Sequence, residues 1–374
     1  MKDVMGVIYT SGEEFSMREL TSRRSLAALP IAARYRMVDF LISSLVNSGV
    51  RNVGVMMQGN YHSLMDHLGS GKEWDLHTRN NGMFILPPMY GKLYEGVLDA
   101  LGANVDYLRR SKQDTVLLLG DRMLFNTRFD EMFKQHEESG ADITVMYTRF
   151  DPFTFDYSSS ARCDRSFVNA DENGIITDIE INPNVASYSN VLMDCVLIKR
   201  TLLIHLADQA ASRGSHSFNL DVLRPNVYNK AMKVCGYEFK GYCRRIETIK
   251  SFYNANMDLL KSDVRKELFG ANPVYTKTRD DAPSKYLPGA EVKNSLLADG
   301  CVIEGRVENC VLFRGVHVGR DAVLKNSIIM QDCSIGTGCE IENTILDKNV
   351  TIFSGGRLIG HRQYPIVMGK NVTL

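Results

Sequence analysis

The sequence predicts an α/β domain with a mostly parallel sheet, followed by a C-terminal left-handed parallel β-helix. Two observations lead to this fold class. Up to about residue 255, short apolar runs alternate with segments of helical period, whereas from about residue 286 an aliphatic residue recurs every five or six positions. We therefore expect an α/β domain over 1–255, a helix and linker over 256–285, and a β-helix domain over 286–374.

The strands expected in the first part are apolar throughout. They are Val4–Tyr9, Val53–Met57, Thr115–Leu119 and Ile143–Tyr147. Such strands are typical of a parallel sheet that is covered on both faces. Helical period predicts the connecting helices Phe40–Ser48, Tyr61–Leu68, Leu98–Arg110 and Phe129–Glu138. In a domain of this kind, ligands bind at the carboxyl ends of the strands.

The second part has neither helical period nor simple alternation. Its regularly spaced aliphatics are Val292, Leu297, Val302, Val307, Leu312, Val318, Val323, Ile329, Ile335, Ile341, Leu346 and Ile352. A step near six is the mark of a left-handed β-helix, in which each face of a coil is a short strand with one inward aliphatic. A β-sandwich of short strands is the alternative. Before this part, Asn256–Ala271 has helical period, and Pro273 and Pro283 mark a linker.

Composition excludes several classes of function. Lys plus Arg equals Asp plus Glu, at 44 each, so the chain has no net charge with which to attract nucleic acid or an anionic membrane. No apolar run approaches the roughly 18 residues that a membrane span needs. The eight cysteines include no C-x-x-C pair, and nothing marks secretion. We therefore expect reduced thiols, no zinc site and a cytoplasmic location.

Several local strings are more specific than the overall pattern. They are Tyr35-Arg36-Met37-Val38-Asp39-Phe40, Trp74-Asp75-Leu76, Tyr94-Glu95-Gly96-Val97-Leu98-Asp99-Ala100, Gly120-Asp121 and Ala255-Asn256-Met257-Asp258. Together, over essentially the whole chain, they resemble the bacterial glucose-1-phosphate adenylyltransferases (ADP-glucose pyrophosphorylases) of glycogen synthesis. The resemblance implies a Rossmann-like sugar-nucleotidyltransferase domain, tetrameric assembly and allosteric control. It also implies a reaction in which ATP and glucose 1-phosphate give ADP-glucose and pyrophosphate with the help of Mg²⁺.

The resemblance assigns roles to residues that this chain keeps. Asp121 matches the catalytic aspartate, which is also a metal ligand, although a Gly-Asp pair can equally be a simple turn or helix cap. The substrate-binding positions that remain are Gln58, Tyr94, Gly96 and Asp99.

The resemblance also implies a segment that binds effectors, and this chain has positively charged residues there. Arg34 and Arg36 stand there, and they are candidates for an anion effector site because guanidinium groups suit phosphate. A solvated surface pair, or an arginine packed between subunits, is the alternative.

At other family positions this chain lacks the residue type that the family uses to bind phosphate, sugar or metal. Glu13 and Glu14 fall in the phosphate-binding loop, where like charge repels a polyanion unless both side chains face solvent. Leu26 replaces the phosphate-binding lysine, and Asn182 replaces the lysine that holds the sugar phosphate. Arg245 stands where the family has its second magnesium aspartate, and a fixed cation repels Mg²⁺.

The metal site is therefore expected to be incomplete. Asp121 remains as a ligand and the second ligand is missing, unless Glu247 supplies it from a different backbone path. We expect that Mg²⁺, the cofactor of the family, is not bound productively here.

These losses lie in separate segments that converge on one reaction centre. They predict a regulatory or activity-enhancing subunit with little or no catalysis of its own, which forms a heterotetramer with a catalytic homologue and responds to an anionic metabolite. One alternative is a weakly active or retuned nucleotidyltransferase that depends on Asp121, and another is a stand-alone sugar- or phosphate-sensing protein. A β-helix acyltransferase is disfavoured, because such a site needs a general-base histidine and only His317 and His361 occur in that half.

Overall fold

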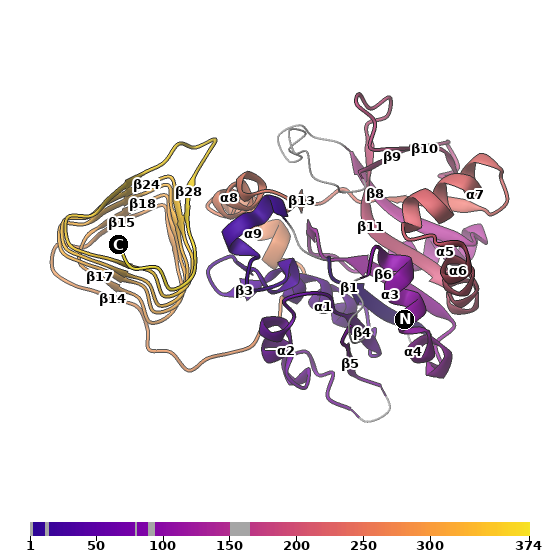
Figure 1. Cartoon of the computed structure of the whole chain (residues 1–374), viewed down its shortest axis with the longest axis horizontal. Coiled ribbons are helices and arrows are strands. Elements are labelled where there is room, and N and C mark those ends of the chain that lie inside the picture. Colours follow the sequence, from indigo (N-terminus) through magenta and orange to yellow (C-terminus); the bar gives the residue numbers. More distant parts are fainter. Residues whose placement is uncertain (1–2, 12–14, 79–80, 89–93, 150–164) are drawn as a thin grey trace.

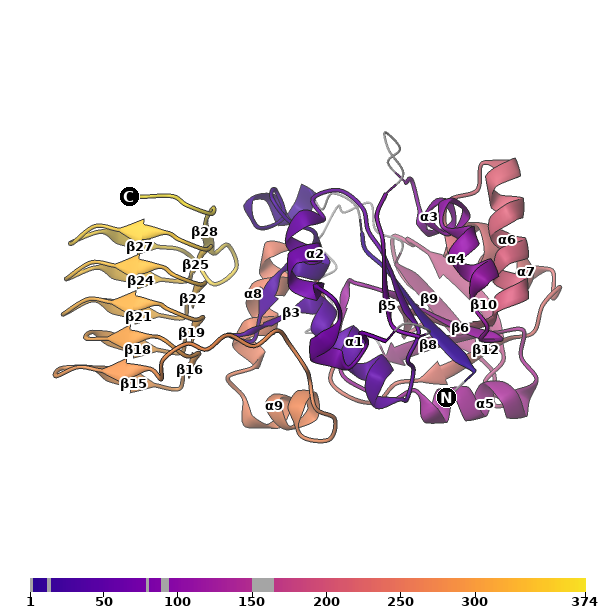
Figure 2. The same ribbon diagram turned by 90° about the horizontal axis from the view of Figure 1, so that it is seen from below.

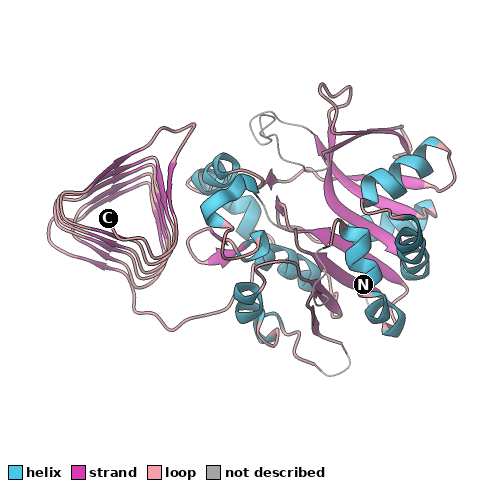
Figure 3. Cartoon of the chain, viewed as in Figure 1, coloured by secondary structure: helices cyan, strands magenta, loops and turns pink. Residues whose placement is uncertain are grey.

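The chain forms two bodies of different construction. The computed structural model describes residues 3–11, 15–78, 81–88, 94–149 and 165–374. Figure 1 shows a sheet flanked by helices beside a triangular β-helix, with an extended segment running between them. The helices are confined to the first body, and the second consists of strands and turns, as Figure 3 makes plain. The predicted fold class, an α/β domain followed by a left-handed parallel β-helix, is confirmed.

The first body is built on a nine-stranded sheet with β1 near its centre. One half is parallel and contains β1 (Val4–Tyr9), β4 (Val53–Met56), β5 (Met83–Leu86) and β6 (Thr115–Gly120). The other half contains β8 (Ile143–Arg149), β9 (Ser166–Ala170), β10 (Ile176–Ile181), β11 (Asn190–Lys199) and β12 (Val234–Glu238). Strand β11 joins the halves, because it pairs antiparallel with β6 on one side and with β8 and β9 on the other.

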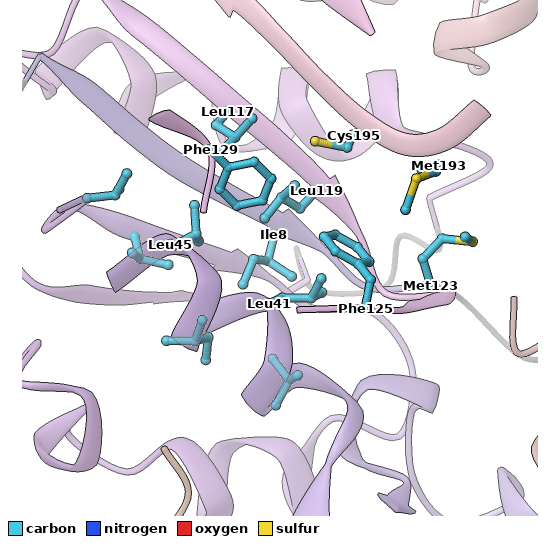
Figure 4. Packing of buried hydrophobic residues seen from close by; sticks show 14 of the residues in the cluster. Ile8, Leu41, Leu45, Leu117, Leu119, Met123, Phe125, Phe129, Met193 and Cys195 are labelled. Carbon is cyan, nitrogen blue, oxygen red and sulfur yellow. The ribbon is translucent and has the colours of Figure 1, made fainter. Parts of the chain in front are cut away.

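Helices cover both faces of this sheet, which explains its apolar strands. On β1, Ile8 faces the cluster that contains Leu41 and Leu45 of α1 (Met37–Asn47), while Met5 and Val7 face the opposite cluster. Figure 4 shows the first cluster, with the α1 side chains directed at the strands. The remaining helices are α2 (His62–Leu68), α3 (Val97–Ala103), α4 (Val105–Arg110), α5 (Asp130–Ser139), α6 (Arg200–Arg213), α7 (Arg224–Tyr228), α8 (Ile249–Asp258) and α9 (Ser262–Phe269).

Two of the predicted helices are each split in the structure. The helix expected over Leu98–Arg110 is broken at Asn104, which bends away from helical geometry and donates its side-chain N–H to the carbonyl of Ala100 (2.8 Å). The helix expected over Asn256–Ala271 is in fact α8 followed by α9. Helix α8 begins earlier than predicted because Thr248 caps it, with its hydroxyl accepting from the N–H of Ser251 (3.0 Å).

The β-helix consists of three five-stranded parallel sheets, one for each side of the triangle. The first contains β14 (Lys285–Tyr286), β17 (Val302–Ile303), β20 (His317–Val318), β23 (Ser334–Ile335) and β26 (Thr351–Ile352). The second contains β15 (Glu291–Lys293), β18 (Arg306–Glu308), β21 (Val323–Lys325), β24 (Glu340–Glu342) and β27 (Arg357–Ile359). The third contains β16 (Leu296–Leu297), β19 (Val311–Leu312), β22 (Ile328–Ile329), β25 (Thr344–Leu346) and β28 (Ile366–Met368). Aliphatic and cysteine side chains fill its interior.

The third sheet of the β-helix packs on the α/β domain. Figure 2 shows the stacked coils with this side turned toward α8. Ile328 points outward from the β-helix and is fully buried in a cluster that also contains Phe252 and Tyr253 of α8. The hydroxyl of Tyr253 donates to the carbonyl of Asn326 (2.6 Å). Within the described residues, no helix has the length and apolarity that crossing a membrane requires.

Short elements complete the α/β domain. They are β2 (Pro30–Ile31), β3 (Tyr35–Arg36), β7 (Met123–Leu124), β13 (Arg244–Arg245) and the short helical turns Phe15–Leu20, Leu26–Ala28, Lys72–Trp74 and Phe218–Leu223. Strand β13 pairs antiparallel with β7, which follows β6 closely, and this pairing brings Arg245 to the end of the parallel strands.

Candidate functional site

A cavity of about 380 Å³ opens at the carboxyl ends of the parallel strands. This is where an α/β sheet is expected to bind ligands. Its walls come from the ends of β1 and β6 and the segments that follow β1, β4 and β6, from Asp194 of β11 and Arg245 of β13, and from residues 94–97 and 216–219. The residues that the sequence assigned to a site and that line this cavity are Gln58, Tyr94, Gly96, Asp121 and Arg245.

Asp121 is buried at the floor of the cavity and is held by groups of this chain. One carboxylate oxygen accepts from the backbone N–H of Ser11 (3.0 Å) and from the Ser11 hydroxyl. The other accepts from the backbone N–H of Ala27 (3.1 Å). Only 1% of the surface of Asp121 is exposed. Its hydrogen bonds connect Ser11, which follows β1, with the turn Leu26–Ala28. Both oxygens that could bind a metal thus already accept hydrogen bonds.

Arg245 lies in the same cavity, clamped between carboxylates. Its Nε donates to the carboxylate of Glu247, and its Nη1 lies 3.3 Å from Oδ2 of Asp194. Only 3% of the side chain is exposed. Burial by itself disfavours the charged guanidinium, but Asp194 and Glu247 outweigh that effect and raise the pKa of Arg245 above its ordinary value.

Glu247 is engaged on both sides of its carboxylate. Besides the bond from Arg245, it accepts from Nη2 of Arg165 (3.0 Å). Burial would raise the pKa of Glu247, but Arg245 and Arg165 lower it to about 2. In this structure Glu247 is therefore ion-paired with two arginines, and its alternative role as the missing metal ligand stays a prediction.

These side chains do not fit a magnesium ion. Mg²⁺ requires several oxygen ligands in a near-octahedral arrangement. Asp121 accepts three hydrogen bonds, Asp194 is paired with Arg245, and Glu247 is paired with two arginines. Among the residues that the structure describes, no group of three or more His, Cys, Asp or Glu side chains is arranged to hold a metal ion.

A second set of polar contacts shapes the rim of the cavity. Oδ2 of Asp99 accepts from the backbone N–H groups of Glu95 (3.0 Å) and Gly96 (3.3 Å), and it lies 2.6 Å from Nδ1 of His216. Nε2 of His216 is 3.2 Å from the Glu95 carboxylate. Gly96 is required here, because a Cβ at this position would lie 2.1 Å from the carbonyl oxygen of His216. Asp99 therefore positions the wall behind the cavity, and His216 is a lining residue that the sequence alone did not reveal.

Other predicted positions lie away from the cavity. Leu26 is fully buried in the apolar cluster between the α/β domain and the β-helix. Asn182 is exposed at the base of the β9–β10 hairpin, where its Oδ1 accepts from the backbone N–H of Arg165 (2.8 Å). Neither residue lines the cavity. The expectation for Glu13 and Glu14 falls outside the described residues.

Arg34 and Arg36 have different surroundings. The guanidinium of Arg34 is exposed and lies 5.9 Å from the centre of the Tyr35 ring. Arg36 is half-buried, and its Nη1 donates to the carbonyl of Ser63 (2.6 Å). Burial is the main reason why the pKa of Arg36 falls to about 10.

Arg36 belongs to a cationic cluster at the junction of the two bodies. Burial, followed by the charges of Arg36 and Arg24, lowers the pKa of Lys348 in the β-helix to about 7. Arg24 forms a buried ion pair with Asp347, next to Lys348 in the chain. We call Arg24, Arg36 and Lys348 the junction cluster. The sequence indicated only Arg36 of this set, because residues more than 300 positions apart carry no local signal of proximity.

Comparison with known proteins agrees with this arrangement. Residues 5–262 match the nucleotidyl transferase family model, and residues 283–363 match the GlmU-like C-terminal hexapeptide model. The chain is 34% identical to glycogen biosynthesis protein GlgD of Bacillus subtilis, over 99% of this chain and 96% of that protein. It is 34% identical to GlgD of Geobacillus stearothermophilus, over 86% of this chain and 82% of that protein. It is 30% identical to glucose-1-phosphate adenylyltransferase of Clostridium botulinum, over 94% of this chain and 97% of that protein. The chain therefore belongs to the nucleotidyl transferase family that includes GlgD and glucose-1-phosphate adenylyltransferase.

Proposed function

We propose that this chain acts in glycogen biosynthesis as a regulatory or activity-enhancing subunit of glucose-1-phosphate adenylyltransferase, with little or no catalysis of its own. The observation that carries the proposal is Arg245, a buried guanidinium in the wall of the cavity, ion-paired with Asp194 and Glu247. The match to GlgD along nearly the full chain gives independent support.

The physical argument concerns charge neutralisation. Transfer of a nucleotidyl group depends on preorganised positive charge and on exact placement of the phosphates. In this chain the carboxylates of the cavity are occupied by internal donors, and we propose that Mg²⁺ is not bound productively. The scaffold, by contrast, keeps its sheet, its cavity and its β-helix. Such a chain is suited to assembly with a homologue more than to turnover.

Reconstitution tests the proposal. The purified chain alone is expected to form no measurable ADP-glucose from ATP and glucose 1-phosphate. Mixed with the catalytic homologue from the same cell, it is expected to form a heterotetramer and to raise the rate or change the effector response. The control is the catalytic homologue alone at the same concentration. Turnover by the isolated chain at ordinary enzyme rates, roughly 1 to 1000 per second, would contradict the proposal.

Regulation is proposed to act through an anionic metabolite. The junction cluster supports this part of the proposal, because it holds a half-buried lysine and two arginines between the domains. Arg34 is a further candidate contact on the exposed side of the same segment. An anion that bound there would contact both bodies and could therefore favour one relative arrangement of the α/β domain and the β-helix over another.

A weakly active nucleotidyltransferase is the second candidate function. The persistence of the cavity, with Gln58, Tyr94 and Asp121 in its walls, favours it. It predicts slow, Mg²⁺-dependent ADP-glucose formation by the chain alone, which the reconstitution assay would detect. A stand-alone sensor would instead fail to co-purify with the catalytic homologue from its own cell.

A further inference from the structure

A second cavity, of about 460 Å³, lies at the opposite end of the parallel strands. Asn52 and Gln113 line it and precede β4 and β6, whereas Gln58 and Asp121 of the first cavity follow the same two strands. Its other walls come from β5, from the end of α3 and from α4 with the residues after it. We call it the amino-end pocket. Its size suits a small ligand.

One wall of the amino-end pocket is aromatic and is fixed by close packing. The Tyr107 ring lies against Gly54 of β4, where a Cβ would be only 2.5 Å from Cε1 of that ring. The Tyr107 hydroxyl donates to Oδ1 of Asn52 (2.8 Å). Phe84 of β5 packs on Tyr107 with ring centres 5.3 Å apart, yet 38% of Phe84 stays exposed. This exposed ring, supported by a fixed neighbour, offers a surface for a planar group.

Buried amides form a polar wall of the same pocket. Asn52 and Gln113 are 5% and 8% exposed, and Nδ2 of Asn52 donates to Oε1 of Gln113 (2.8 Å). Nε2 of Gln113 has one acceptor within the described residues, Oδ1 of Asn81 at 3.4 Å. Since an amide nitrogen carries two hydrogens, Gln113 has donor capacity that the described part of the chain does not use.

Positive charge exceeds negative charge around the amino-end pocket. Arg110 and Lys112 line it and are exposed, and within the described residues neither side chain has a hydrogen bond or an ion pair. Asp106, the carboxylate in the lining, lies 3.7 Å from Arg109. The lining therefore favours an anion, with the modest strength expected of charges that solvent screens.

We propose that the amino-end pocket binds a small organic anion with a planar ring, an aromatic phosphate monoester or carboxylate. The ring stacks on Phe84, and the charged group contacts Arg110 and Lys112. An inorganic anion leaves the aromatic wall unused, and a neutral ring leaves the cations unused, so a ligand with both parts binds more tightly than either part alone. The proposal does not depend on the regulatory role, because the pocket is separate from the first cavity and from the junction cluster.

A fluorescence titration tests the proposal. Trp74 is the only tryptophan of the chain and is 1% exposed, so a Phe84→Trp variant carries a second indole that reports on the pocket. Phenyl phosphate, benzoate, inorganic phosphate and phenol are titrated separately, with the parent chain as the blank. Phenyl phosphate or benzoate is expected to change the emission saturably, with a Kd at least about fivefold lower than those of phenol and inorganic phosphate. No saturable change with either aromatic anion, or equal affinity for phenol or inorganic phosphate, would overturn the proposal.

Removing the two cations tests their role. Arg110→Met combined with Lys112→Met in the Phe84→Trp chain is expected to raise the Kd by about fivefold or more. The matched control removes two exposed lysines of the β-helix, Lys293→Met combined with Lys325→Met, and should leave the Kd unchanged. Equal effects of the two pairs would show attraction by net charge only and would overturn the assignment. If the Phe84→Trp chain fails to fold, calorimetric titration of the parent chain and the two lysine or arginine pairs decides the same question.

Discussion

Leu26 and Arg245, two positions that the resemblance predicted to belong to the family site, have different surroundings in the structure. Arg245 lies in the cavity wall, where it puts a positive charge at the position for which the resemblance implies a negatively charged aspartate. Leu26 leaves the cavity altogether and joins the apolar contact between the two bodies. Its neighbour Ala27 still serves the cavity, because its backbone N–H donates to Asp121. The same short turn thus stabilises the domain junction on one side and the cavity floor on the other.

Restoring the family lysine at Leu26 is expected to damage the fold. The side chain is fully buried among apolar groups, so Leu26→Lys places an uncompensated charge in the core. The free energy of unfolding should fall by about 3 kcal/mol or more, as measured by urea denaturation. Leu220→Lys, at a position 44% exposed, should change it by less than about 0.5 kcal/mol. A Leu26→Lys variant as stable as the parent would contradict the expected cost of a buried charge, and a variant that gained ADP-glucose synthesis would show that this position still belongs to a working site.

The sequence identified part of the site and could not identify the rest. Five assigned residues line the cavity. Gln58 and Asp121 follow β4 and β6, whose carboxyl ends meet at one edge, and Tyr94, Gly96 and Arg245 were indicated by the family resemblance alone. Leu26 and Asn182 were expected at the same centre, but family alignment says nothing of where a replaced side chain points. His216 was missed because a single histidine in a loop carries no pattern of its own.

Among the elements of the α/β domain, the predicted strands came closer to their observed bounds than the predicted helices, but β5, β9, β10, β11 and β12 were not predicted. Apolar runs gave β1 its observed bounds, and the step of five or six residues marked the coils of the β-helix. At two positions the inward side chain is that of the next residue, Ile303 in place of Val302 and Leu324 in place of Val323. The two split helices show the limit of periodicity. Apolar spacing continues across Asn104, and only local hydrogen bonding, which the spacing does not contain, ends α3 there.

The turn between β25 and β26 carries Lys348, and its environment predicts a pH dependence. The pKa of Lys348 is about 7 in the folded chain, below its ordinary value of 10.5. Between these values the unfolded chain binds more protons than the folded chain, so the free energy of unfolding rises with pH through this window. We expect a gain on the order of 1–2 kcal/mol between about pH 7 and about pH 9, measured by denaturant unfolding.

Substitution assigns this dependence to one side chain. Lys348→Met should remove most of the rise, whereas Lys325→Met, on an exposed position of β21, should leave it in place. If the free energy of unfolding of Lys348→Met rose with pH as steeply as that of the parent chain, another group would be the one that titrates. An anionic effector at the junction cluster should favour the charged lysine and so take up protons on binding, which titration in buffers of different ionisation enthalpy would detect.

The molecule as a whole is joined by an apolar contact reinforced by polar ones. The cluster that contains Leu26 and Phe252 continues into Val311, Ile328 and Ile345 of the β-helix. The ion pair between Arg24 and Asp347 and the hydrogen bond from Tyr253 to Asn326 cross the same junction. These contacts connect α8 and the turn Leu26–Ala28 directly to the β-helix.

Ile328→Arg tests whether the two bodies unfold as one unit. Ile328 is fully buried on the outward face of β22, so a charge there should separate the β-helix from α8. Scanning calorimetry is expected to show the α/β domain unfolding earlier, with a loss of about 3 kcal/mol or more in its free energy of unfolding. Limited proteolysis should become faster between residues 270 and 284. The matched control is Val323→Arg, on the partly exposed face of β21, which should unfold like the parent chain. If Ile328→Arg also kept a single unshifted transition, the junction would not be what couples the domains, and an effector bound there could not act on the α/β domain by changing their contact.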